Sequence, residues 1–133
     1  MANFSRYNAK DTTIMVDGVY ITGLGESMWT FAKEEALAEN AVGAQGDVVR
    51  NEINNPIYTA TVTVQQTSPQ VNFLMGLKDR TEPFPIWMIN KALGRTEGGS
   101  KAMINEIPES ALGAEADELE FSFTIYDGSV TFD

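Results

Sequence analysis

Strict alternation of apolar and polar side chains constrains this chain more than any other feature. In the last quarter of the sequence, apolar residues occupy every second position, at Leu119, Phe121, Phe123 and Ile125. The positions between them are polar: Glu118, Glu120, Ser122 and Thr124. A period of two is typical of a strand with one face on a core and one in water. We therefore predict a strand over residues 119–126.

A second long strand is predicted over residues 57–66. Tyr58, Ala60, Val62 and Val64 would lie on one face, and Thr59, Thr61, Thr63 and Gln65 on the other. β-Branched residues favour this conformation because their two heavy atoms on Cβ pack well on a pleated surface. Shorter strands are predicted over residues 12–16, 19–22, 28–33, 86–89, 101–107 and 129–132.

Two Asp-Gly pairs stand between apolar runs, at residues 17–18 and 127–128. Asp-Gly favours the type I′ turn of a two-residue hairpin, which needs positive φ at both central positions. We therefore expect the strand over 12–16 to pair with that over 19–22. On the same grounds the strand over 119–126 would pair with that over 129–132.

The clearest helix signal begins at Ser68, a good N-cap, with Pro69 at the first helical position. Apolar residues follow at helical spacing, and Pro83 ends the pattern by Arg80. A shorter helix is predicted over residues 34–40, and residues 94–100 are predicted to form a loop. The expected fold is one mostly β (α+β) domain over residues 1–133, with strands and one packed helix.

Composition removes whole classes of function. The chain has 133 residues, a formal net charge of −10, and neither Cys nor His. Thiolate zinc sites, Cys nucleophiles and His-based catalysis are therefore excluded. A basic nucleic-acid reader is not expected, because the charge has the wrong sign. No apolar run approaches the roughly 20 residues of a membrane span, so we expect no membrane partner.

Candidate chemistry is sparse. Glu118 and Glu120 share a predicted strand face with their carboxylates about 7 Å apart, a spacing found in glycosidase pairs, although solvated surface acids explain them more simply. Trp29 and Trp87 are predicted to pack in the core; alternatively, exposed Trp29, Trp87 or Tyr58 would stack on sugars in a sugar-binding β-sandwich. No catalytic, cofactor-binding or metal-ligating residue is predicted.

Four runs together carry a resemblance that extends over nearly the whole chain. They are VDGVYITG at residues 16–23, AVGAQGDVVR at 41–50, TATVTVQQTSP at 59–69 and FSFTIYDGSVTF at 121–132. In this order they resemble the tail tube proteins of long-tailed bacteriophages, particularly those with contractile tails.

The resemblance implies a fold, an assembly and a place in the virion. The subunit would be a small β-sandwich or half-barrel flanked by one helix. Six subunits would close into a ring around a continuous inner barrel, and rings would stack into a tube through which DNA passes without specific binding. Partners would be other copies, tail sheath and baseplate proteins. The protein would be made in the host cytoplasm and reside in the phage tail.

Two sets of residues are assigned to this assembly. An acidic, hydroxyl-rich bore would repel DNA, and its candidate lining is Glu118, Glu120, Thr59, Thr61, Thr63 and Gln65. Residues 41–56 would form an extended loop that reaches the adjacent ring, where Arg50 pairs with an acid; an ordinary hairpin loop is the equally weighted alternative. The candidate contacts between rings are Arg50, Asn51, Glu52, Asn54 and Asn55.

Overall fold

The computed structural model describes residues 5–108 and 117–132. The predicted domain over residues 1–133 therefore extends beyond the described residues. Strands dominate, with one short α-helix, which confirms the mostly β fold class. The elements are η1 (Ala9–Asp11), β1 (Thr12–Val16), β2 (Val19–Tyr20), β3 (Leu24–Lys33), β4 (Ala38–Val42), β5 (Val48–Glu52), β6 (Tyr58–Gln65), α1 (Val71–Gly76), η2 (Leu77–Asp79), β7 (Phe84–Asn90), β8 (Arg95–Glu106), β9 (Glu118–Ile125) and β10 (Ser129–Phe132).

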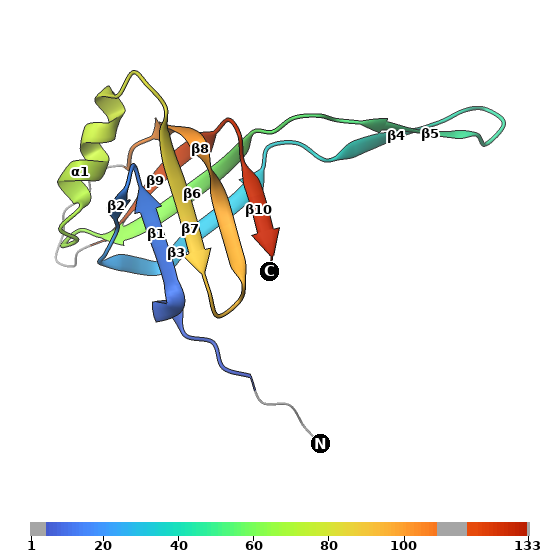
Figure 1. Cartoon of the computed structure of the whole chain (residues 1–133). Helices are drawn as coiled ribbons and strands as arrows, with labels where there is room; N and C mark the ends of the chain where they lie inside the picture. Colours follow the sequence, from blue (N-terminus) through green and yellow to red (C-terminus); the bar gives the residue numbers. More distant parts are fainter. Residues whose placement is uncertain (1–4, 109–116, 133) are drawn as a thin grey trace.

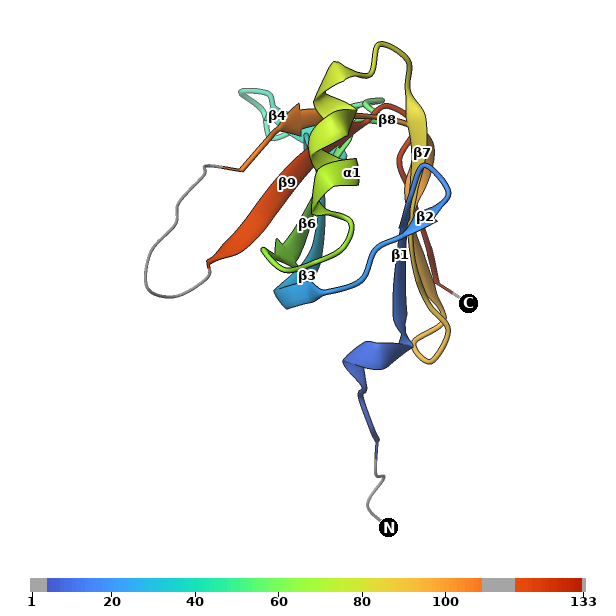
Figure 2. The same ribbon diagram turned by 90° about the vertical axis from the view of Figure 1, so that its left-hand side faces the viewer.

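One eight-stranded sheet folds over into two layers. Its strand order is β2-β1-β7-β8-β9-β6-β3, and β10 also pairs with β8. The β2-β1-β7 layer and the β9-β6-β3 layer face each other, with β8 passing between them (Figure 2). Among the described residues, β2 and β3 end the sheet and do not pair with one another. The result is an open half-barrel.

β8 can serve both layers because the sheet bends sharply along it. Gly98 has φ +142, and a Cβ there would lie 2.1 Å from the Ile86 carbonyl oxygen. Just beyond, the register against β7 shifts, and β8 carries an extra residue between Gly99 and Ala102. A bulge of this kind bends a strand and increases its twist.

The core fills the space between the layers. Inward side chains of β1 and β7 meet those of β6 and β9, and the rings of Phe84 and Phe123 meet edge to face at 6.0 Å between centroids. The helical segment α1–η2 covers one open side and buries Leu74 and Leu77 (Figure 2). Burial of apolar area from both layers is what holds the bent sheet together.

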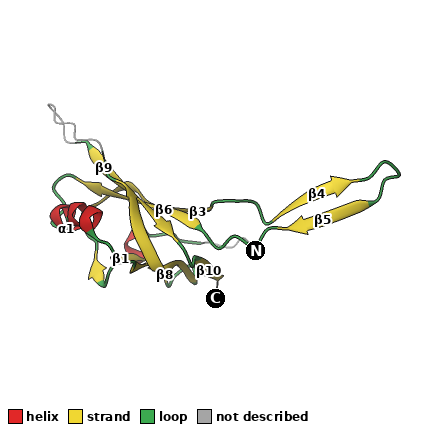
Figure 3. Cartoon of the chain, turned by 90° about the horizontal axis from the view of Figure 1, so that it is seen from above, coloured by secondary structure: helices red, strands yellow, loops and turns green. Residues whose placement is uncertain are grey.

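A long hairpin leaves this body. β4 and β5 pair over five residues each, from Ala38 opposite Glu52 to Val42 opposite Val48. The hairpin projects away from the two layers and packs on neither (Figures 1 and 3). We call residues 38–52 the arm. The predicted loop over 41–56 is therefore a paired hairpin for most of its length, and it is also extended.

Two local predictions are wrong because pairing between strands overrides local composition. The predicted helix over residues 34–40 is absent, and Ala38–Val42 is a strand instead. A helix of seven residues is marginal by itself, whereas pairing with β5 satisfies the backbone. The predicted loop over 94–100 belongs mostly to β8, whose two edges pair with β7 and β10. Its glycines mark close backbone approach within a strand.

The turn at residues 17–18 is confirmed, with φ of 52 at Asp17 and 79 at Gly18. The hairpin predicted at residues 127–128 is wrong. β10 pairs with β8 rather than with β9, so both strands follow the same edge of β8 in succession. The Asp127 carboxylate instead accepts hydrogen bonds from the Ser100 hydroxyl and the Lys101 N–H, at the bulge of β8.

The predicted helix ends at Arg80 as expected, after the 3-10 turn η2. It starts later than predicted, because its N-cap is Gln70 and not Ser68. The Ser68 hydroxyl donates to the Thr22 carbonyl at 2.6 Å and accepts from the Gln70 N–H at 3.3 Å. Ser68 therefore anchors the chain before the helix to the loop between β2 and β3.

Candidate functional site

The two predicted polar rows lie on one continuous surface. β6 and β9 pair in register, which sets Thr61 opposite Ser122 and Gln65 opposite Glu118. Directly paired residues project from the same side of a sheet. We call this side of β6 and β9 the polar face; its members are Thr59, Thr61, Gln65, Glu118, Glu120, Ser122 and Thr124.

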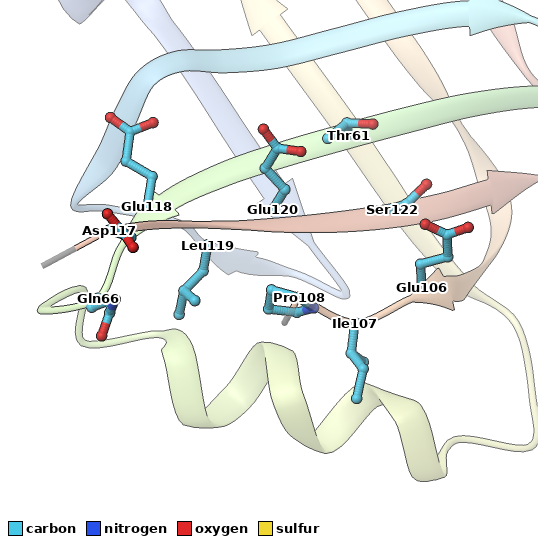
Figure 4. A pocket seen from close by; sticks show the side chains of 10 residues that line it. All are labelled: Thr61, Gln66, Glu106, Ile107, Pro108, Asp117, Glu118, Leu119, Glu120 and Ser122. Carbon is cyan, nitrogen blue, oxygen red and sulfur yellow. The ribbon is translucent and has the colours of Figure 1, made fainter. Parts of the chain in front are cut away.

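The polar face continues into a groove of about 440 Å³. Glu118, Glu120 and Ser122 project from one side of β9, and Leu119 projects from the other side toward α1 (Figure 4). The described residues that line the groove include acidic side chains but neither Lys nor Arg. Its lining is Thr61, Gln66, Glu106, Ile107, Pro108, Asp117, Glu118, Leu119, Glu120 and Ser122.

Two of the predicted bore residues, Glu118 and Thr63, are not simply solvent-exposed members of the polar face. The Glu118 carboxylate accepts a hydrogen bond from the Glu26 N–H at 3.0 Å, where the pairing of β3 with β6 is interrupted by a bulge. A Cβ at Gly25 would lie 2.6 Å from the same carboxylate. Thr63 is only 4% exposed, although its register position is on the polar face. The bond between Glu26 and Glu118 has no local sequence signal, because β3 and β9 meet only through tertiary structure.

The residues predicted to make contacts between rings lie on β5 of the arm and in the segment between β5 and β6. Arg50, Asn51 and Glu52 are exposed on β5, and Arg50 Nε lies 4.0 Å from the Glu52 carboxylate. An exposed pair at that distance contributes little stability. Asn55 serves the base of the arm, because its side chain accepts from the Ile57 N–H at 2.9 Å and its carbonyl accepts from Lys33 Nζ. Asn54 is exposed nearby.

The arm exposes apolar side chains along its length. Val42 and Val48 are cross-strand partners near the tip and are 68% and 64% exposed. Val49, on the opposite side of the ribbon, is 57% exposed. A two-stranded ribbon is marginally stable in water without a packing surface. The exposed pair of Val42 and Val48 therefore favours a binding partner on that side of the arm.

A cluster of large apolar side chains lies on the outer surface of the other layer. Met15 pairs with both Tyr20 and Trp87, so the three side chains share one side of β1, β2 and β7. A groove of about 390 Å³ lies on this side. We call it the apolar groove after its apolar members, Met15, Tyr20, Ile89 and Ala92; Asp11, Thr13 and Lys91 complete its lining.

This arrangement corrects the prediction for Trp87. Ile86 and Met88 take the inward positions of β7, and Trp87 between them faces outward and half-buried. Residues 84–89 read as an unbroken apolar run, which is typical of a strand covered on both faces. That run was the sequence signal that β7 is apolar on both faces.

Trp29 packs as predicted, at the margin of the core. Its ring stacks on Phe31, which stacks on Tyr58 with 4.6 Å between centroids. The indole N–H of Trp29 donates to the Glu97 carboxylate at 3.1 Å and so links β3 to β8. One ring face of Tyr58 is thereby covered by Phe31.

The pKa of the Asp127 carboxyl group is lowered in the folded chain. Desolvation raises the pKa of Asp127, but the hydrogen bonds from Ser100 and Lys101 outweigh it and hold the pKa below its ordinary value. In the described part of the chain, no three acidic side chains gather as metal ligands do, and no helix is long and apolar enough to cross a membrane.

Comparison with known proteins gives matches at the level of structure only. No protein-family model matches the chain, and no curated protein matches its sequence. The fold is similar to that of the anti-feeding prophage cap, the AFP tube terminating cap, with a TM-score of 0.63 and 9% identity. That match covers 100% of this chain and 95% of the other.

A second similar structure is the PVC sheath/tube terminator of an extracellular contractile injection system, in its extended state. Its TM-score is 0.59 at 10% identity, and the match covers 98% of this chain and 99% of that one. Both neighbours therefore share the fold over essentially their whole lengths.

Proposed function

We propose that this chain is a non-enzymatic structural subunit of a phage-tail-like particle, whose copies assemble into a ring around the particle's tube axis. The observation that carries the proposal is the full-length similarity of its fold to two proteins that terminate tubes. The same observation supports a location in the particle. Synthesis in the host cytoplasm is part of the proposal that follows from the sequence resemblance alone. Further copies, tube, sheath and baseplate proteins are the proposed partners.

The open sheet supports assembly through copies of itself. Among the described strands, β3 pairs only with β6, so its outer edge is open to another chain. Beyond Ala102, β8 has left β7 and likewise offers an edge. Unpaired edges are templates for pairing between chains. Pairing β3 of one copy with the end of β8 in the next would extend the layer that carries the polar face.

In such a ring the polar face would line the bore. The carboxylates of Glu106, Glu118 and Glu120 would meet passing DNA with charge of its own sign. Proteins hold DNA by neutralising its phosphates with Lys and Arg side chains. The described residues that line the groove of the polar face include neither. The bore would let DNA pass without specific binding. The ring of six follows from the sequence resemblance alone.

Two positions along the tube are compatible with this role. The resemblance in sequence favours the repeating tube subunit, in stacked hexameric rings. The names of the two similar structures favour the ring that ends the tube, and we take this as the better-supported alternative. Stacking into long tubes would distinguish the first role, and single or paired rings the second.

Negative-stain microscopy and sedimentation of the purified full chain test the proposal. Rings with a central opening are the expected result, with the number of copies counted from class averages. Addition of preformed tail tubes would place the rings at tube ends if the chain terminates the tube. A chain that stays monomeric at every concentration, with or without tubes, would contradict the proposal.

A further inference from the structure

β7 is apolar on both sides, yet only one side meets the core. Phe84, Ile86 and Met88 point inward and are buried. Trp87 and Ile89 point outward beside Met15, on the side that carries the apolar groove. Tyr20 borders this groove and is 62% exposed. A strand that is apolar on both faces is normally covered on both.

The arm exposes a second apolar surface, which packs on neither layer of its own chain (Figures 1 and 3). Val42 and Val48 share one side of the ribbon, and Arg50 shares that side because it is two residues from Val48. The arm points away from its own body, so it does not reach the apolar groove of the same chain (Figures 1 and 3). A second copy can supply what the first cannot.

Charges beside the two surfaces are complementary. Asp47 and Arg50 flank the valine pair, and Lys91 and Asp11 lie at the lining of the apolar groove. An arm seated there brings Arg50 within reach of an acid and Asp47 within reach of a base. Such charges at the rim of an interface set its orientation more than its affinity.

We infer that the arm of one copy docks through Val42 and Val48 into the apolar groove of a neighbouring copy. The inference rests on the proposed function, because it names a contact through which the copies assemble. The contact is heterologous: each copy gives an arm and receives one. Contacts of this kind build rings or open filaments rather than closed pairs.

Matched variants on the two sides of the arm provide the first test. Val42→Asp with Val48→Asp places charge on the docking side, and Tyr20→Glu with Ile89→Glu places it in the groove. Each double variant should raise the protein concentration at which half of the chains are assembled by at least about tenfold, because the buried apolar contact is lost. Sedimentation measures this concentration. Val49→Asp is the control, on the same strand but the opposite side, and should assemble as the wild type does.

Introduced cysteines provide a second measurement, since the chain has none of its own. Val48→Cys and Tyr20→Cys variants are mixed and oxidised, and we expect a disulfide-linked pair of chains containing one of each. Val49→Cys in place of Val48→Cys should give at least about tenfold less product, because its side chain points away from the groove.

The outcomes separate the inference from the proposed function. If the wild type forms rings and the arm and groove variants do so equally well, arm docking is refuted while the proposed function stands. If the wild type never assembles, the proposed function fails and the inference with it. Circular dichroism of each variant establishes that the body is still folded.

Discussion

At Gly98 the backbone of β8 passes so close to β7 that no side chain fits. The φ of +142 is available to glycine, and an added Cβ would lie 2.1 Å from the Ile86 carbonyl oxygen. We expect Gly98→Ala to lower the free energy of unfolding by about 2–4 kcal/mol, through overpacking and backbone strain together. Urea denaturation measures the loss.

Gly76→Ala is the control for that substitution. Gly76 ends α1, and a Cβ there would meet nothing within 4 Å. Its φ of −67 suits alanine. The change should leave stability unaltered or raise it by up to about 1 kcal/mol, because alanine restricts the unfolded chain. Equal losses for both glycines would contradict the role given to Gly98.

Asp127 makes the bend in β8 sensitive to acid. Its pKa is held down in the folded chain: desolvation acts to raise it, and the hydrogen bonds from Ser100 and Lys101 prevail. A lowered folded pKa contributes stability that is present above the unfolded pKa, about 4, and is lost as pH falls through the folded value. The contribution is small because the side chain is exposed.

Carbon-detected NMR titration of the Asp127 carboxyl group tests this. The wild-type pKa should lie below that of an unstructured aspartate. Ser100→Ala removes the side-chain donor and should move the pKa upward. An unchanged pKa in Ser100→Ala would show that the hydroxyl does not stabilise the carboxylate.

Among the elements, β3 depends on a carboxylate from outside its own strand. The bulge near Glu26 is held by the Glu118 carboxylate, 3.0 Å from the Glu26 N–H. Glu118→Ala should cost about 1–2 kcal/mol of unfolding free energy, because the acceptor is a charged carboxylate at an exposed position. Glu118→Gln keeps an acceptor oxygen and should lose less. Chemical denaturation of both variants measures the difference.

Glu120→Ala is the comparison for the bulge. Glu120 projects from the same side of β9 two residues away and is exposed (Figure 4). Its removal should change stability by less than about 0.5 kcal/mol, as is usual for surface positions. A similar loss in Glu118→Ala and Glu120→Ala would mean that charge, and not the hydrogen bond, governs this end of the sheet.

At the scale of the assembled molecule, the charge of the polar face should decide whether DNA is retained. Thr61→Lys with Glu120→Lys changes the charge of this face by +3 per copy. The assembled variant should bind short duplex DNA at least about tenfold more tightly than the wild type at low salt, because each introduced lysine neutralises a phosphate. Fluorescence anisotropy across a salt series measures the affinity.

Glu39→Lys with Val49→Lys makes the same change of +3 on the arm. DNA bound there lies outside a bore and should be digested by nuclease, whereas DNA held at the polar face should be protected. Protection that is equal in both variants would contradict the placement of the polar face in the bore.

The sequence determined the strands whose alternation is strict. In β6 and β9 every second residue must leave water, so burial alone fixes which face is inward, and Ala60, Val62, Phe121 and Phe123 are buried as predicted. The turn at Asp17 and Gly18 was likewise local, because positive φ is a property of those two residues. Membership of the polar rows followed from the same period of two.

Only the tertiary structure decided which strands meet. The partner of β10, the strand formed by residues 95–100, and the arm in place of a helix all depend on pairing between segments distant in sequence. The bond from Glu26 to Glu118 has the same origin. Short-range patterns report how one segment divides between core and water. Backbone pairing and close approach at Gly98 depend instead on what lies across the sheet, and no local pattern carries that information.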